Sequence, residues 1–314
     1  MAEWRRLLNM FPQKIYVEQT AEVDRQISTA AAWLDEADAV LIGAGAGLSS
    51  AAGLVYHGRR FTENFAEFIA RYDSRYMTDM YSAGFYPFPT EEEKWGYWSK
   101  HACLNSIEMA GLPLYKELRA VVREKKCFIF TTNVDNQFFK TGFAAAEIFA
   151  TQGSYSLIQC QKRCHKRTYD ATELFLTMDQ QRRACQIPSE LVPRCTLCGG
   201  PMVMNLRCDD FFVEDENWHR AANSYGLFLE GMKEKKLLLL ELGVGHNTPV
   251  IIRFPFEKMA IENENWSLVR INSSEAAIPQ VLGDRALGVK ADLVEAIEKF
   301  NEKMRSLHAS GVKA

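Results

Sequence analysis

Short apolar runs that alternate with amphipathic stretches form the main pattern of this chain. The apolar runs have the length and composition of buried strands, and they cover residues 39–42, 127–131, 147–150, 237–242 and 266–271. Between them, apolar residues recur at three- and four-residue steps, which predicts helices over residues 20–36, 114–125, 218–235 and 291–307. Strands that alternate with helices predict a doubly wound parallel sheet of the α/β class, with polar loops at the carboxyl ends of its strands.

Two stretches depart from this alternation. Residues 55–110 are rich in aromatic side chains, and the helical spacing of Phe61, Phe65 and Phe68 predicts a small helical cap with an aromatic core. A second interpretation is that a few of these rings line a lid over a flat ligand. Residues 155–213 are polar, contain cysteines and look irregular, so we expect an insertion there. At the helix starts, Thr20 is expected to act as a cap and Pro113 as a first helical residue.

The stretch from Ala39 to Leu54 combines a strand, a glycine loop and a helix. The apolar run is followed by Gly43, Gly45 and Gly47, and Ser49-Ser50 are expected to open a small-residue helix that runs to Gly53. Glycine lets a backbone approach a ligand closely, and amides at a helix start attract anions, so this order predicts a diphosphate cradle. The dinucleotide fingerprint G-x-G-x-x-G fails, because Leu48 stands at its third glycine. A simple tight turn is the alternative.

Charge and composition exclude several classes of partner. The chain has 314 residues with a net charge of −3, so no basic stripe indicates binding of nucleic acid or of an anionic membrane. No apolar run is long enough to span a membrane, and the first residues lack a signal-peptide core. We therefore expect a cytoplasmic protein whose eight cysteines are thiols or metal ligands.

Two cysteine pairs predict a metal site. Cys160 and Cys164 form one pair and Cys195 and Cys198 the other, and four thiolates suit tetrahedral Zn²⁺. Such a closed set leaves no position for a substrate, so the zinc would be structural. His165 and Cys208 are possible substitute ligands, and ordinary reduced thiols are the alternative.

Three polar residues that follow predicted strands are candidates for chemistry: Asn133, Asp135 and Gln152. Seen alone, each could be a turn former. Their context resembles the sirtuin family. Residues 45–54, G-A-G-L-S-S-A-A-G-L, are similar to its G-A-G-I-S-x-x-S-G-I loop, and residues 131–135, T-T-N-V-D, to its T-Q-N-I-D motif. Gly243-Val244-Gly245 stands where the family has G-T-S, and Ile271-Asn272 matches its I-N. The motifs keep their order across roughly residues 20–305.

The resemblance implies an NAD-binding, Rossmann-like domain built from residues 20–54, 111–154 and 214–307. Residues 55–110 would form a helical aromatic lid, and residues 155–213 a zinc-binding insertion. It implies catalytic roles for Asn133, Gln152 and Asp135, with Asp135 holding the nicotinamide carboxamide and Asn133 ordering the ribose. The other implied NAD-binding residues are Gly45, Ala46, Gly47, Ser49, Gly53, Thr132, Gly153, Gly243, Val244, Gly245, Asn247, Asn272 and Lys290.

Two departures from the family pattern narrow the expectation. Residues 55–58, V-Y-H-G, replace P-D-F-R, and Arg59, Arg60 and Phe61 are candidates for the displaced roles. The family's catalytic His is replaced by Gln152, as in the macrodomain-linked class M sirtuins. That class implies protein ADP-ribosylation, with a lipoyl-carrier protein similar to the glycine-cleavage H protein as acceptor and a macrodomain hydrolase as functional partner.

The change at Gln152 also has a chemical consequence. Deacylation by a sirtuin needs a base, and a Gln amide does not titrate near neutral pH. Unless His57 or His246 supplies that base, we expect transfer of ADP-ribose without deacylation. An NAD-dependent deacylase and a non-catalytic NAD sensor or adaptor stay open as alternatives. A hydride-transferring dehydrogenase is disfavoured by the broken fingerprint.

Overall fold

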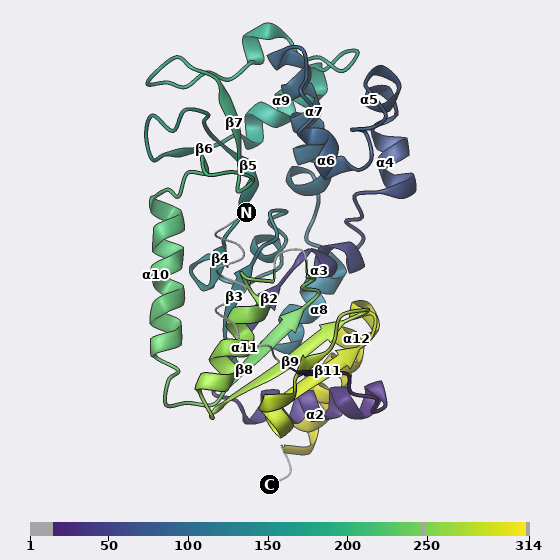
Figure 1. The fold of residues 1–314 in the computed structure, drawn as a ribbon, viewed down its shortest axis with the longest axis vertical. Helices are drawn as coiled ribbons and strands as arrows, with labels where there is room; N and C mark the ends of the chain where they lie inside the picture. The colour runs from purple at the N-terminus through teal and green to yellow at the C-terminus, as the bar shows by residue number, and fades with distance from the viewer. Residues whose placement is uncertain (1–14, 247–248, 312–314) are drawn as a thin grey trace. The chain divides into compact units, whose positions relative to one another are not determined.

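The computed structural model describes residues 15–246 and 249–311, and these form two compact units (Figure 1). The first unit contains the residues up to Leu48, Glu117–Phe130 and the residues from Gly226 onward. The second contains Ser49–Lys116 and Thr131–Tyr225. Among the described residues, no helix has the length and apolar character needed to cross a membrane.

A parallel sheet forms the centre of the first unit. Its strands are β2 (Ala39–Ala44), β3 (Lys126–Thr131), β8 (Leu237–Leu242), β9 (Trp266–Asn272) and β11 (Ala286–Lys290). They lie in the order β11-β9-β8-β2-β3, and the pairs β11–β9, β9–β8 and β8–β2 are parallel. Every residue of β2 and β8 is buried, as their largely apolar sequences predict, and Glu241 of β8 is the one charged residue among them. The short strands β1 (Tyr16–Val17) and β10 (Ile278–Pro279) pair separately.

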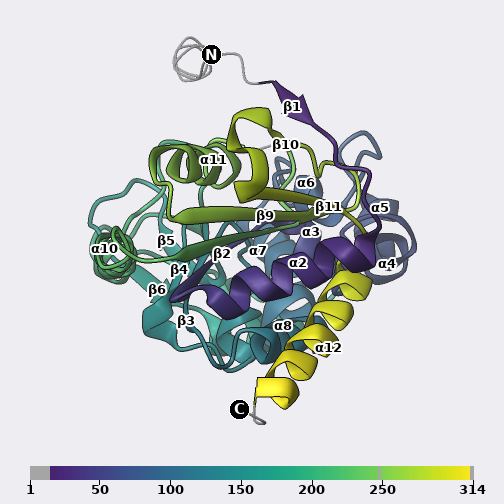
Figure 2. The same cartoon turned by 90° about the horizontal axis from the view of Figure 1, so that it is seen from below.

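Helices cover both faces of this sheet, as the doubly wound class requires. Figure 2 shows α2 (Val23–Glu36) and α12 (Leu293–Gly311) side by side on one face and α11 (Arg253–Glu262) on the other. The predicted fold class is therefore confirmed. Thr20 as a cap is wrong, because the helix begins at Val23 behind Glu22, which makes no side-chain capping bond.

The chain passes between the units four times, once within β3 and once within each of three helices, α3 (Ala46–Ala51), α8 (Pro113–Val121) and α10 (Glu216–Glu230). Pro113 opens α8 as predicted. The prediction that Ser49-Ser50 open the helix after the glycine loop is wrong, because α3 already begins at Ala46. Gly47 therefore lies inside the helix, and the loop after β2 is reduced to Gly45.

The second unit contains an antiparallel sheet and a group of short helices. Its strands are β5 (Gly153–Cys160), β6 (Thr168–Asp170) and β7 (Met202–Leu206), in the order β6-β5-β7, with a further short strand β4 (Ile148–Ala150). Its helices are α4 (Gly58–Asn64), α5 (Ala66–Arg71), α6 (Met80–Gly84), α7 (Glu91–Ala102) and α9 (Thr172–Gln181). The expectation that residues 155–213 are irregular is wrong, since this segment has strands, a helix and a buried core that it shares with α7.

That core explains why the polar composition of the segment was misleading. Tyr155 and Ile158 of β5 are buried in the same cluster as Phe175 and Met178 of α9. Polar residues such as Ser156 stand between the apolar ones along β5, so the segment looks polar although it contributes to a core. The predicted aromatic core of residues 55–110 is confirmed, with Phe61, Phe65 and Phe68 each at most 2% exposed.

Candidate active site

Polar side chains form a directed chain of hydrogen bonds at the carboxyl end of β3, within the second unit. The Asn133 amide donates from Nδ2 to the Tyr115 hydroxyl at 3.3 Å. Tyr115 lies 2.8 Å from Ser49 Oγ, which donates to Asp135 Oδ2 at 2.5 Å. Since Asn133 supplies a hydrogen to Tyr115, the Tyr115 hydroxyl can donate its own hydrogen to Ser49. The sequence predicted three members of this chain and missed Tyr115, which lies on the buried face of α8.

The carboxylate of Asp135 ends this chain and is only 2% exposed. Burial is the main cause that raises its pKa, while bonds from Ser49 and from the backbone N–H of Gln137 act in the opposite direction. Asn133 is also only 9% exposed, so neither of these two residues at the end of β3 faces solvent. Two local hydrogen bonds hold this segment: the Asn133 N–H donates to the Thr131 hydroxyl, and the Gln137 N–H donates to the Asp135 carboxylate.

Gln152 and Gly153 lie where the chain enters β5. The Gln152 side chain is half-buried and donates from Nε2 to the Thr151 hydroxyl at 3.1 Å. Gly153 has a φ of +93°, and a Cβ there would clash with the Asn205 carbonyl oxygen. This glycine is therefore required by the close approach of β5 and β7. Thr132, the remaining predicted residue of this region, is half-buried.

Arg207 is a cation of this region that the sequence patterns did not indicate. Its backbone N–H donates to the Gln152 carbonyl at 3.0 Å, and its guanidinium pairs with Glu214 at 2.7 Å. The guanidinium also lies over the Phe212 ring, 4.2 Å from the centroid. A salt bridge and an aromatic contact fix this positive charge beside the Gln152 backbone. No motif could have identified it, since it follows β7, far from Gln152 in the sequence.

The loops of the first unit that follow β2 and β8 are packed directly on one another. The Gly47 N–H donates to the Gly243 carbonyl at 2.9 Å. A Cβ added to Gly45 or Gly47 would lie 2.8 or 2.7 Å from that carbonyl oxygen, and Gly243 has a φ of +60°. The glycines therefore permit this backbone contact, a reason that sequence reasoning, which assigned them to ligand approach, did not include.

The remaining predicted residues of the first unit differ in accessibility. Gly245 is exposed, and a Cβ there would meet only the Glu275 carboxylate, at 3.6 Å. Val244 is buried, whereas Ala46 is exposed at the start of α3. The prediction for Asn247 lies outside the described residues.

Asn272 and Lys290 end neighbouring strands and are in register with one another. Asn272 is buried and binds the Val244 carbonyl from Nδ2 at 3.2 Å, while Lys290 is exposed and lies 3.7 Å from Glu18. Gly53, in the second unit, has a φ of +99° just after α3, where glycine is the preferred end of a helix.

The four predicted zinc ligands come together in the second unit. All four Sγ atoms of Cys160, Cys164, Cys195 and Cys198 lie within 4.8 Å of one another. The Sγ atoms of Cys160 and Cys198 are 3.7 Å apart, and those of Cys164 and Cys195 are 3.5 Å apart. A tetrahedral site with Zn–S bonds of about 2.3 Å has sulfur atoms roughly 3.8 Å apart, so this donor set fits Zn²⁺.

The surroundings of the cluster favour a thiolate at Cys195, whereas burial and the neighbouring sulfur atoms raise the pKa of Cys164. Backbone N–H groups of Cys198 and Leu197 are the main cause that lowers the pKa of Cys195. Gly199, directly after Cys198, has a φ of +67°, a turn conformation that glycine adopts readily. His165 lies outside the cluster, with Nε2 3.5 Å from Cys195 Sγ, and Cys208 is not part of it. The cysteine ligand set is therefore confirmed over both substitutes.

The three residues after the stretch that replaces P-D-F-R, residues 59–61, have mainly structural contacts. Arg60 donates to the Asn105 side chain at 2.6 Å and to the Val55 carbonyl at 3.2 Å. Phe61 is packed in the aromatic core, and Arg59 pairs with Glu63 on the surface. Of the two alternative bases, His57 is exposed, and His246 is bonded to Glu275.

Comparisons of the sequence identify relatives over most of the chain. It is 36% identical to the "Protein ADP-ribosyltransferase" of Staphylococcus aureus (strain Mu50 / ATCC 700699) over 261 residues, which are 83% of this chain and 82% of that protein. It is 32% identical over 286 residues to the "Probable bifunctional ADP-ribose hydrolase/ADP-ribosyltransferase" of Fusarium oxysporum f. sp. cubense. That match covers 86% of this chain and 47% of the fungal protein. No family model matches the chain.

Comparisons of the structure identify the same fold in Sir2 proteins. A Sir2 homologue in complex with NAD superposes with a TM-score of 0.56 at 12% identity, over 93% of this chain and 98% of that one. A single-residue variant of a Sir2 homologue in complex with ADP-ribose gives a TM-score of 0.55 at 13% identity, with 90% and 97% covered. At this identity the likeness concerns the fold alone.

Proposed function

Since the chain belongs to the sirtuin-type family of protein ADP-ribosyltransferases, we propose that it transfers ADP-ribose from NAD to a protein acceptor, and that this acceptor is a lipoyl-carrier protein similar to the glycine-cleavage H protein. The relatives described above confirm the predicted family and enzyme class. The link to a macrodomain and the identity of the acceptor stay proposals.

The observation that carries the proposal is the side chain at Gln152. The amide donates to the Thr151 hydroxyl and cannot take up a proton near neutral pH. It can orient a ribose hydroxyl, but it cannot deprotonate that hydroxyl for attack on an acyl group. General-base catalysis contributes roughly two to four orders of magnitude, so deacylation should be slow while departure of nicotinamide remains possible.

Asp135 and Asn133 are proposed to carry the first step. Cleavage of the bond between ribose and nicotinamide builds positive charge on the sugar, and a fixed negative charge or oriented dipole stabilises that charge. Asp135 is held by Ser49 and by the Gln137 N–H, so its carboxylate is preorganised. Asn133 has its amide oriented by the bond to Tyr115, so its dipole is fixed before the ribose or the attacking group arrives.

The loops of the first unit are proposed to hold the diphosphate and adenosine half of NAD. Gly245 is exposed and has no side chain of its own, so a phosphate can approach its backbone closely. Asn272 and Lys290, in register at two strand ends, are proposed to contact the adenosine ribose. Because α3 has only six residues, loop amides should contribute more than a helix dipole.

We further propose that a macrodomain hydrolase removes the modification. The name of the fungal relative joins an ADP-ribose hydrolase and an ADP-ribosyltransferase in one protein, and this chain covers 47% of it. A cytoplasmic setting is consistent with four thiolates reserved for zinc, since thiols persist in reducing compartments.

Incubation with NAD labelled in its adenylate phosphate tests the proposal. Native lysate and a purified lipoyl-carrier protein, with and without its lipoyl group, serve as acceptors, and the Asp135→Asn protein is the control. We expect label on the carrier that a macrodomain hydrolase then releases. Labelling of a different protein would contradict the proposed acceptor, and nicotinamide release coupled to acyl-lysine hydrolysis with no labelled protein would contradict the transferase.

A further inference from the structure

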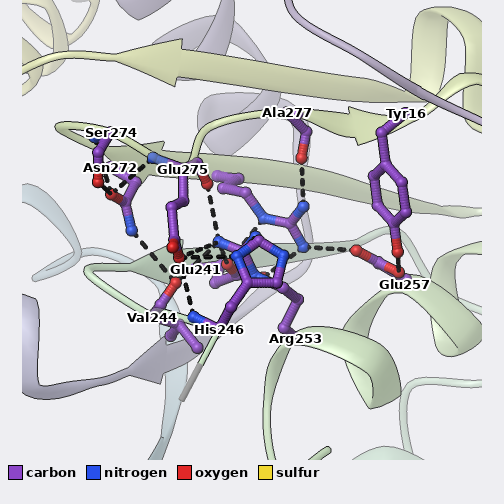
Figure 3. Close-up of polar contacts among 11 residues, drawn as sticks. Tyr16, Glu241, Val244, His246, Arg253, Glu257, Asn272, Ser274, Glu275 and Ala277 are labelled. Atoms are coloured by element: carbon purple, nitrogen blue, oxygen red, sulfur yellow. Dashed lines mark hydrogen bonds and ion pairs between the residues drawn. The ribbon is translucent and has the colours of Figure 1, made fainter. Parts of the chain in front are cut away.

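Two arginines and two glutamates are buried together beneath the loops of the first unit that follow β8 and β9 (Figure 3). Arg253 and Arg270 are at most 1% exposed, and Glu241 and Glu257 are fully buried. Arg270 binds both oxygens of Glu241, at 2.7 and 2.8 Å, and Glu257 at 2.9 Å. Arg270 therefore bridges both carboxylates, and the Tyr16 hydroxyl donates to the second oxygen of Glu257 at 3.0 Å. Arg253 lies 3.5 Å from Glu241 and binds a further set of partners.

Arg253 binds backbone atoms of two loops that follow different strands. Its Nη2 donates to the Val244 carbonyl at 2.8 Å, in the loop after β8, and to the Glu275 carbonyl at 2.7 Å, in the loop after β9. Its Nη1 lies 3.1 Å from His246 Nε2, and His246 Nδ1 lies 2.8 Å from the Glu275 carboxylate. The two N–H groups of Nη2 thus fix the distance between the two loops, and the planar guanidinium holds this nitrogen in place.

The Val244 carbonyl connects Arg253 to the residues that are proposed to bind NAD. It also accepts a hydrogen bond from Asn272 Nδ2 at 3.2 Å. Gly243, the residue before it, accepts from Gly47 at 2.9 Å. A shift of Val244 would therefore move Asn272 on one side and the glycine contact with α3 on the other.

Stability alone gives a poor reason for a cation at this position. Removing a guanidinium from water is costly, and buried ion pairs are often no more stabilising than apolar residues of similar volume. Arg253 also has a buried Nε atom that finds no partner among the described residues. Because Nε makes no hydrogen bond there, the presence of Arg253 is best explained by the groups that its Nη1 and Nη2 atoms contact.

We propose that Arg253 is a positioning residue of the NAD site: it holds the loops after β8 and β9 in the shape that binds the cofactor, so NAD affinity depends on it more than the chemical step does. The proposal rests on the proposed function only for the identity of the ligand.

Arg285 offers a matched control in the same unit. Its Nη1 also donates to three backbone carbonyls, those of Ala260, Asn263 and Trp266, at 2.6 to 3.1 Å. Trp266 is the first residue of β9, so these bonds lie at the amino end of that strand. Loss of Arg285 should cost stability in a similar way without moving the cofactor loops.

The experiment compares Arg253→Met, Arg253→Lys and Arg285→Met with the unmodified chain. Lysine keeps the charge, but its ammonium lies on a flexible stem without the rigid planar geometry of the guanidinium, so it should fold and hold the two carbonyls less precisely. Calorimetry gives the Kd for NAD and for ADP-ribose, kinetics of nicotinamide release give KM and kcat, and thermal unfolding gives Tm. We expect Kd and KM to rise roughly ten- to hundredfold in both Arg253 variants, for the loss of one or two hydrogen bonds, with kcat within about threefold.

Arg285→Met should lower Tm and leave Kd unchanged. If Arg253→Met does not fold, the Lys variant decides alone. An unchanged Kd in folded Arg253→Lys, or an equal rise in Kd in Arg285→Met, would overturn the proposal. An unmodified chain that binds ADP-ribose but labels no protein would contradict the proposed function and leave this inference standing.

Discussion

The candidate cofactor loops of the first unit consist mainly of backbone, whereas the candidate site of the second consists of side chains. After β2 and β8, Gly47 and Gly243 bring two backbones into contact and leave Gly245 exposed. After β3, Asn133 and Asp135 are joined to other side chains in a buried chain of hydrogen bonds. A substitution in the loops of the first unit acts by changing the shape that the ligand meets. A substitution in the second unit acts by removing a charge or a hydrogen bond.

Because of this difference, we expect that mutations can change NAD binding and the chemical step independently. Substitutions in the loops of the first unit should change affinity for NAD at constant chemistry. Substitutions around Asp135 should stop the chemistry while the loops still bind NAD. The predictions below run from the largest expected effect to the smallest.

Removal of the zinc ligands should have the largest effect, and this effect should be confined to the second unit. Replacing Cys195 or Cys198 by Ser should release metal and unfold the sheet of β5, β6 and β7, because binding of a structural zinc is coupled to folding. Hydrogen exchange should become fast in β5 while β2 and β8 stay protected. Elemental analysis that finds well under one zinc per unmodified chain would contradict the site.

Asp135→Asn should reduce nicotinamide release by roughly two to three orders of magnitude, since the variant loses the preorganised negative charge but keeps the shape. Asp170→Asn is a matched control, because Asp170 is an exposed carboxylate of the same unit that accepts from the Thr172 N–H at 2.8 Å. Normal turnover in Asp135→Asn would contradict the assignment of the site.

The stability of Asp135→Asn should depend on pH in a defined direction. Burial raises the pKa of Asp135, so the folded state binds this proton more tightly than the unfolded state. The stabilisation is complete below the unfolded pKa and is lost as the pH rises through the folded pKa. The Asn variant does not titrate, so its Tm relative to the unmodified protein should increase with pH over that window. A Tm difference that falls with rising pH would show that the folded pKa is lowered.

Substitution of two glycines in the first unit should have smaller effects, on Tm for one glycine and on NAD affinity for the other. Gly47→Ala should lower Tm, because its Cβ would lie 2.7 Å from the Gly243 carbonyl oxygen. Gly245→Val should leave Tm nearly unchanged, because its Cβ would lie at an ordinary contact distance of 3.6 Å from the Glu275 carboxylate, and should weaken NAD binding on the order of tenfold by blocking close approach of the phosphates. Thermal unfolding and calorimetry check both. Equal effects of the two changes on Tm would contradict the difference in their surroundings.

Much of the parallel sheet could be predicted because its strands are buried on both faces. Such strands have continuous apolar sequences, and β2, β3, β8 and β9 all lie within a residue or two of their predicted limits. β11 was not predicted, since A-L-G-V-K is short and contains a glycine. The antiparallel sheet was missed for another reason: polar residues between the buried ones give β5 a polar average although it contributes to a core.

The candidate site was predictable where one motif holds several of its residues. Asn133 and Asp135 share a motif, and the four cysteines have recognisable spacings. Tyr115, Arg207 and Arg253 come from other parts of the chain and meet their partners only through folding. The one available signal was a charge inside an apolar strand, as at Glu241 and Arg270, because such a residue needs a buried partner.

The central claim is that this chain transfers ADP-ribose and lacks the base for deacylation. Two assays on one preparation test it most directly: retention of labelled ADP-ribose on the acceptor protein, and NAD-dependent hydrolysis of an acyl-lysine peptide. The account predicts transfer that disappears in Asp135→Asn, together with deacylation at background level. Brisk deacylation by the unmodified chain would contradict it, because a group other than Gln152 would then have to act as the base.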